Sequence, residues 1–179
     1  MARAEITSTA RIEAFSDAVI AIVITIMVLE FRLPYALSFV ILTNLWISHH
    51  ALLHSVQRAT PVLMWMNCNL LFWMSLVPFA TMVFGESPLT HSAVALYGSS
   101  LAMTSLSFTS LRWVVIKQNK FQGDALRAQR DGFRRSLIAN AIYVVSVPVA
   151  LFSVYVAFAL FIVSPIMFGV WYMRLSKRV

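Results

Sequence analysis

The sequence predicts an all-α membrane protein, folded as a single six-helix transmembrane domain over residues 1–179. Hydrophobic residues make up 60% of the chain and charged residues only 12%. A soluble domain of this size has too little interior to bury that much apolar surface, so the expected solvent is lipid. The charges gather between long apolar runs, which predicts repeated crossings of a bilayer.

Each predicted span is a largely apolar run of 19 to 27 residues, long enough to cross the hydrocarbon core. The six spans cover residues 12–31, 35–57, 61–84, 90–116, 134–152 and 155–173.

The later spans need further justification. Small and hydroxyl residues from Gly98 to Ser107 make the fourth span polar at its centre, which favours close helix packing inside a bundle. The fifth and sixth spans share one uncharged stretch that is too long for one crossing and must fold back near Pro148 and Ser153. Pro165 is expected to kink the sixth span.

The distribution of basic residues predicts the orientation. Six spans place both termini on one side, together with the basic linker at 117–133. Twelve of the 14 Lys and Arg residues then share that side: Arg3, Arg11, Arg58, Lys117, Lys120, Arg127, Arg130, Arg134, Arg135, Arg174, Lys177 and Arg178. Arg32 lies in an opposite loop and Arg112 within the fourth span. By the positive-inside rule, the termini are predicted to be cytoplasmic, and the excess charge is expected to meet anionic lipid rather than nucleic acid.

The first span combines ionisable groups with an apolar stripe. Ionisable groups near membrane depth are expensive and find partners inside the protein or along a water path. Asp17 therefore needs hydrogen-bond donors. The candidates are Trp46 and His49 of the second span and Asn69 of the third. The predicted structural network comprises Arg11, Phe15, Ser16, Asp17, Trp46, His49 and Asn69.

The stripe follows helical spacing and comprises Ile22, Thr25, Ile26 and Leu29. Several copies around an axis would stack rings of branched side chains, and a narrow apolar ring closes a pore by dewetting. A partial loss of the hydration shell favours potassium over sodium, and the Thr25 hydroxyls could replace lost water oxygens. An ordinary lipid-facing helix face remains the alternative.

Two other functional classes remain as alternatives. A proton- or cation-coupled secondary transporter could use Asp17 and His49. A membrane enzyme or haem protein could use His50 and His54, which lie at i and i+4, a metal-binding spacing, but no carboxylate lies near them in sequence. We therefore expect no metal site, no cofactor and no enzymatic activity.

The motifs resemble those of the transmembrane protein 175 family of potassium channels. The resemblance rests on the family's Arg-x-x-x-Phe-Ser-Asp signature at Arg11, Phe15, Ser16 and Asp17, on Trp46-Ile-Ser-His49-His50, and on Asn69-Leu-Leu-Phe with Pro78-Phe79 and Gly85-Glu86. It covers the first three spans closely and the remainder only in hydropathy.

The resemblance implies a prokaryotic homotetramer in which the first helix lines a central pore. The hydrophobic constriction falls on Ile22, with Ile26 and Leu29 further outward, and the hydroxyl layer falls on Thr25. Potassium is then the permeant ion, and the inner membrane is the expected location. Glu30 and Glu86 would lie near the outer mouth, either raising the local cation concentration or serving as solvated interface charges.

Overall fold

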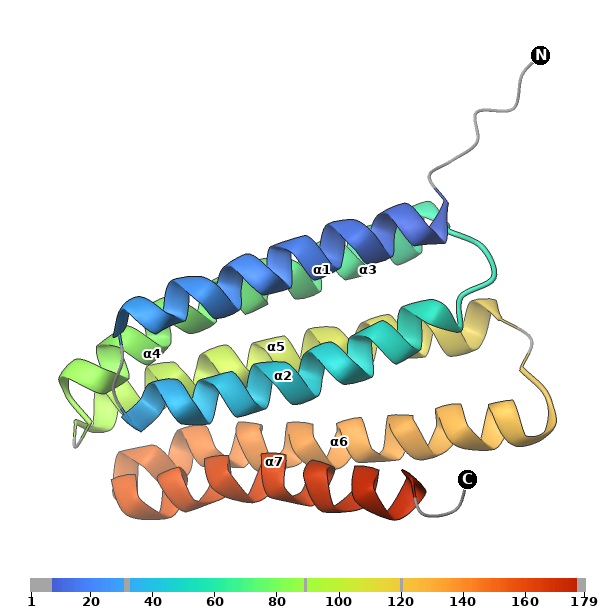
Figure 1. Cartoon of the computed structure of the whole chain (residues 1–179). Helices are drawn as coiled ribbons and strands as arrows, with labels where there is room; N and C mark the ends of the chain where they lie inside the picture. The colour runs from blue at the N-terminus through green and yellow to red at the C-terminus, as the bar shows by residue number, and fades with distance from the viewer. Residues whose placement is uncertain (1–7, 31–32, 89, 120, 177–179) are drawn as a thin grey trace.

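The computed structural model describes residues 8–30, 33–88, 90–119 and 121–176, and the side chains of residues 29, 30, 33 and 168–176 are outside the description. These residues form seven α-helices and one 3₁₀ helix (Figure 1). Their bounds are α1 Thr9–Ile26, η1 Met27–Glu30, α2 Leu33–His54, α3 Pro61–Ser75, α4 Val77–Glu86, α5 His91–Gln118, α6 Gly123–Phe152 and α7 Val154–Ser176. The all-α prediction is confirmed.

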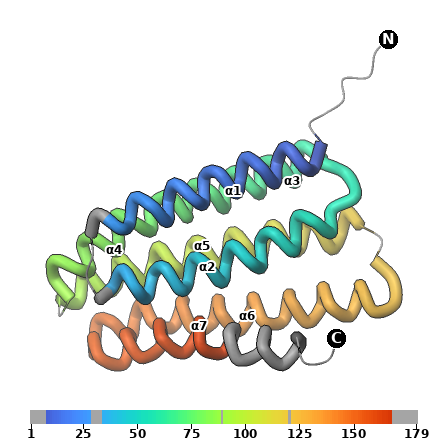
Figure 2. Tube along the Cα trace, viewed as in Figure 1, coloured from blue at the N-terminus to red at the C-terminus, as the bar shows by residue number. Residues whose placement is uncertain are grey.

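The helices form a bundle of three layers, and successive passes run antiparallel. Figure 1 shows α1 with α3 in one layer, α2 with α5 in the next, and α6 with α7 in the third. The tube in Figure 2 shows the chain turning back at alternate ends, and α7 runs back toward the end where α1 begins. The path therefore makes six passes, the number expected from the sequence.

Two helices depart from the predicted boundaries. The third pass is divided at Leu76 into α3 and α4, because Pro78 has no backbone N–H to donate to the carbonyl of Met74. Most of the predicted linker is helical and continuous with the fifth pass: α6 begins at Gly123, whose φ of 55° lies in the left-handed region. Residue 31, the last of the first predicted span, and residue 32, the first of the join that follows it, lie outside the description.

Hydropathy and length vary among the passes. In the described part of the chain, three helical segments are long and apolar enough by those criteria alone to cross a membrane: Pro34–His54, Pro61–Glu86 and Gly123–Phe152. The segment Val154–Met167 is apolar but shorter. The first pass has charges near its start, and α5 has the polar centre noted above. Both of these less apolar passes pack against several other helices.

The polar residues of α5 form its contacts inside the bundle. Ser38 of α2 hydrogen-bonds both Thr81 of α4 at 2.9 Å and the Tyr97 hydroxyl of α5 at 2.8 Å. Asn140 of α6 donates to Thr109 at 3.0 Å. Hydrogen bonds between helices satisfy polar groups that lipid could not. The polar centre of α5 is therefore part of the interior.

Candidate functional site

Helix α1 has a buried face and an exposed face. Its buried residues are Ile12, Ser16, Ile20 and Val23, one stripe at helical spacing. On another face, the side chain of Ile22 is 57% exposed and that of Ile26 is 51% exposed. Packing within the described chain thus leaves two bulky aliphatic side chains of α1 more than half exposed.

Thr25 belongs to the exposed face. Its hydroxyl donates a hydrogen bond of 2.9 Å to the backbone carbonyl of Ile22, one turn earlier. A hydroxyl oxygen that donates its proton to the backbone retains lone pairs that can accept or coordinate. Thr25 can therefore present an oxygen beside Ile22 and Ile26, whereas the side chain of Leu29 lies outside the description.

A buried chain of hydrogen bonds holds α1 against α2 and α3. The His49 Nε2–H donates to the Asn67 side-chain carbonyl at 2.8 Å, and the Asn67 amide donates to the Ser16 hydroxyl at 2.8 Å. Ser16 in turn donates to the carbonyl of Ile12 at 2.7 Å. Ser16 and His49 are fully buried and Asn67 is 1% exposed. This chain joins three helices through direct hydrogen bonds between side chains.

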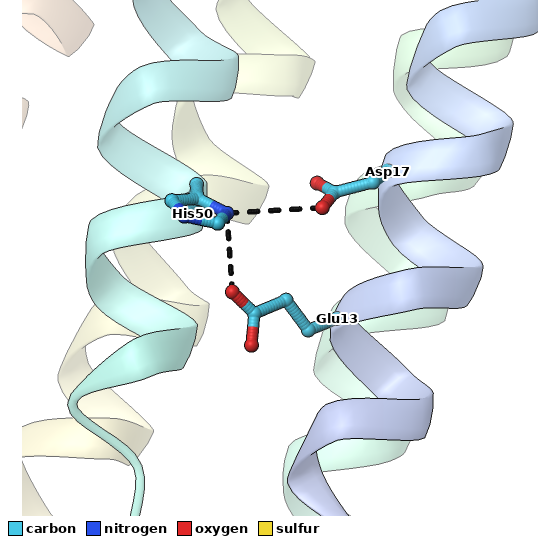
Figure 3. A group of neighbouring side chains, drawn as sticks. All are labelled: Glu13, Asp17 and His50. Atoms are coloured by element: carbon cyan, nitrogen blue, oxygen red, sulfur yellow. Dashed lines mark ion pairs between the residues drawn. The ribbon is translucent and has the colours of Figure 1, made fainter.

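Asp17 lies in a second, partly exposed cluster. The Trp46 indole N–H donates to Asp17 Oδ1 at 2.9 Å. His50, one turn beyond Trp46 on α2, places Nδ1 3.7 Å from Asp17 Oδ2 and 3.1 Å from Glu13 Oε1. Figure 3 shows the three ionisable side chains turned toward one another from α1 and α2. A carboxylate–imidazole cluster of this kind can exchange protons or hold a cation.

The structure corrects the predicted network at three residues. Asn69 is exposed and donates instead to the Ser107 hydroxyl of α5 at 2.8 Å. It lies two residues from Asn67, so the two amides project from different sides of α3. Arg11 is exposed and Phe15 is 57% exposed, and neither belongs to the hydrogen-bonded chain of the described residues.

The predicted network omits three members of these clusters: Asn67, Glu13 and His50. The sequence does not distinguish Asn67 from Asn69, because only the rotation of α3 determines which of the two amides faces α1. Glu13 and Asp17 are spaced i and i+4, as are Trp46 and His50, and these matched spacings were the available signal that two helix faces meet. The carboxylates absent near His50 in sequence are supplied by α1.

Of the two acidic residues predicted near the outer mouth, the structure describes the side chain of one. Glu86 is exposed at the end of α4, at the end of the bundle opposite the start of α1 (Figure 1). The side chain of Glu30 lies outside the description.

Comparisons with known proteins agree with this arrangement. The family model described as "Endosomal/lysosomal potassium channel TMEM175" matches residues 11–35 and 33–78. A protein of Chryseobacterium sp. (strain P1-3) named a potassium channel is 34% identical, covering 82% of this chain and 85% of that relative. One of Chamaesiphon minutus, also named a potassium channel, is 28% identical, covering 80% of this chain and 88% of the relative.

Solved structures share the fold. The crystal structure of a lysosomal potassium-selective channel TMEM175 homologue from Chamaesiphon minutus superposes with a TM-score of 0.82, at 23% identity, over 90% of this chain and 96% of that one. A variant of the potassium channel MtTMEM175, solved in complex with a nanobody fusion protein, gives a TM-score of 0.67 at 16% identity, over 94% of each chain. Given this fold and the 34% identity to the Chryseobacterium relative over most of both lengths, the chain belongs to the transmembrane protein 175 (TMEM175) family of potassium channels.

Proposed function

We propose that four copies of this chain surround a central pore lined by α1, with the Ile22 side chains forming the narrowest ring. The chain is a multi-pass membrane protein and, as a member of this family, a potassium channel and not an enzyme. The observation that carries the pore assignment is the exposed stripe of α1, where the bulky apolar side chains of Ile22 and Ile26 are more than half exposed.

The proposed constriction is a hydrophobic gate. Rings of Ile22 and Ile26, with Leu29 further outward, exclude water when narrow. An ion that passes must shed part of its hydration shell, which sodium holds more tightly than potassium. Thr25 lies between the two isoleucine layers, and its hydroxyl oxygen can replace some of the lost water. Potassium is thus the permeant ion, and the mechanism requires no bound cofactor.

Orientation and assembly follow from the same arrangement. The excess of basic residues at the end where α1 begins supports cytoplasmic termini in a prokaryotic plasma membrane. Glu86, exposed at the other end, and Glu30 would then lie near the outer mouth, where negative charge raises the local cation concentration. The partners proposed are three further copies of the chain and the surrounding lipid.

The transporter alternative loses its proposed relay. It required Asp17 and His49 to act together, but Asp17 accepts from Trp46 and His49 donates to Asn67. The two side chains thus belong to separate clusters, and the buried His49 has a structural partner. A polar clamp that orients α1 fits these contacts better.

Ion flux in liposomes tests the proposal. Ile22→Ala should widen the constriction, increase flux and raise sodium permeability relative to potassium, which reversal potentials or flux under opposed gradients would measure. Ile138→Ala is the matched control, because Ile138 is 49% exposed but lies on α6. If Ile22→Ala conducts and discriminates as the parent does, Ile22 does not form the constriction.

A further inference from the structure

The cluster of Glu13, Asp17 and His50 contains two carboxylates and a single imidazole to pair with them. Within the described residues, both carboxylates form their ion pairs with the same imidazole. One histidine can neutralise at most one of the two negative charges. The side chains of Glu13 and Asp17 are only 19% and 34% exposed, so water screens this excess incompletely.

Three potential ligand atoms converge in this cluster. One nitrogen or oxygen from each residue lies within 4.8 Å of the others (Figure 3). Two ligands bound to one zinc ion at about 2.0–2.2 Å lie roughly 3 to 3.5 Å apart. The distances from His50 Nδ1 are 3.1 Å to Glu13 Oε1 and 3.7 Å to Asp17 Oδ2. Small side-chain rotations would therefore suffice to place all three around one ion.

Neighbouring groups already orient the ligands. Trp46 holds Asp17 Oδ1, which leaves Oδ2 directed toward His50. The His50 ring lies between those of Trp46 and His54, with centroid separations of 5.9 Å and 6.4 Å. Such contacts around a ligating carboxylate and imidazole fix their geometry before an ion arrives. The His50 side chain is also half exposed, so an ion can enter and retain water ligands.

We propose that Glu13, Asp17 and His50 bind one divalent transition-metal ion per subunit, with Zn²⁺ as the representative ion. A mixed imidazole and carboxylate set suits zinc and its neighbours, whereas magnesium and calcium prefer oxygen ligands alone. The ion links α1 to α2 at positions about one and a half to two and a half turns before Ile22. Binding of the ion does not require the chain to conduct, so this proposal and the proposed function can fail separately.

Zinc binding to the purified full-length channel tests the proposal. The protein is prepared without a histidine tag and titrated with ZnCl₂, and separately with MgCl₂, by calorimetry. We expect one Zn²⁺ per subunit in the parent, with affinity weakened roughly tenfold or more by His50→Ala and by Glu13→Gln. His91→Ala is the control, because His91 is exposed at the start of α5, at the other end of the bundle, and it should bind as the parent does.

Thermal unfolding of the same proteins with and without ZnCl₂ gives a second readout. An ion that binds the folded state raises Tm, so the parent and His91→Ala should shift and His50→Ala should not. Glu13→Gln keeps the test valid if His50→Ala fails to fold. The proposal is overturned if the parent shows no saturable binding, if both cluster variants bind as the parent does, if His91→Ala weakens binding equally, or if Mg²⁺ binds as tightly. A protein that binds Zn²⁺ here but passes no potassium would refute the channel proposal alone.

Discussion

At the scale of single residues, Asn67 has a central position because it joins α3 to both α1 and α2. It accepts from His49 and donates to Ser16, and all three residues are buried. Leaving a buried polar group without its partner costs about 1–3 kcal/mol. Two such groups depend on this one amide.

Asn67→Leu, which is similar in size, should therefore lower the free energy of unfolding by about 2–3 kcal/mol. Thermal unfolding of the purified protein, followed by tryptophan fluorescence and gel filtration, measures the loss. Asn69→Leu is the matched control and should lose less, because Asn69 is exposed and donates only to Ser107. Equal losses would show that the chain through Asn67 has no special role.

Gly132 is a second residue whose identity the structure explains, because a side chain there would meet Arg112. Arg112 of α5 is 9% exposed, its guanidinium lies 5.0 Å from the Phe108 ring centre, and it donates to Gln129 at 3.4 Å. A Cβ at Gly132 would overlap that guanidinium. The absence of a side chain on α6 thus makes room for a buried arginine.

Gly132→Ala should destabilise the parent by about 1–3 kcal/mol through overpacking. In an Arg112→Ala background the overlap is removed, so the same change should be neutral or stabilising by up to about 1 kcal/mol, the helix preference for alanine. Chemical or thermal unfolding of the four proteins gives the coupling. Additive effects would rule out the contact as the cause.

At the scale of elements, α1 packs on one face and leaves another uncovered, and the uncovered face includes a hydroxyl. Thr25 donates to the carbonyl of Ile22, so its oxygen lone pairs remain free to meet an ion. The buried face with Ser16 fixes the rotation of the helix. That rotation determines which residues reach the proposed pore.

Thr25→Val keeps the shape of the side chain but removes its oxygen, so it should lower the preference for potassium over sodium while assembly is unchanged. Thr25→Ser retains the oxygen and should preserve most of that preference. Reversal potentials under bi-ionic conditions measure both. Unchanged selectivity in the valine variant would contradict a role for the hydroxyl layer.

At the scale of the whole molecule, six passes place the starts of α1 and α6 at one end and the α4–α5 turn at the other (Figure 1). Ser8 and Ser87 are exposed at these opposite ends. The charge distribution predicts that the first is cytoplasmic and the second is external.

Single cysteines test this orientation in a Cys68→Ala background. A membrane-impermeant maleimide added to intact cells should label Ser87→Cys and leave Ser8→Cys unlabelled until the cells are opened. The opposite pattern would invert the topology. Labelling of both in intact cells would contradict a six-pass path.

Hydropathy alone predicted an all-α membrane protein, because lipid demands apolar helices wherever a chain crosses it. It also marked α1 through Asp17, since an ionisable group near that depth requires partners. Tertiary structure decided which partners those are. The choice of Asn67 over Asn69 depends on the rotation of α3, and the meeting of Glu13 with His50 depends on how α1 lies against α2. Such contacts between helices are set by the packing of whole faces, which no local stretch of sequence encodes.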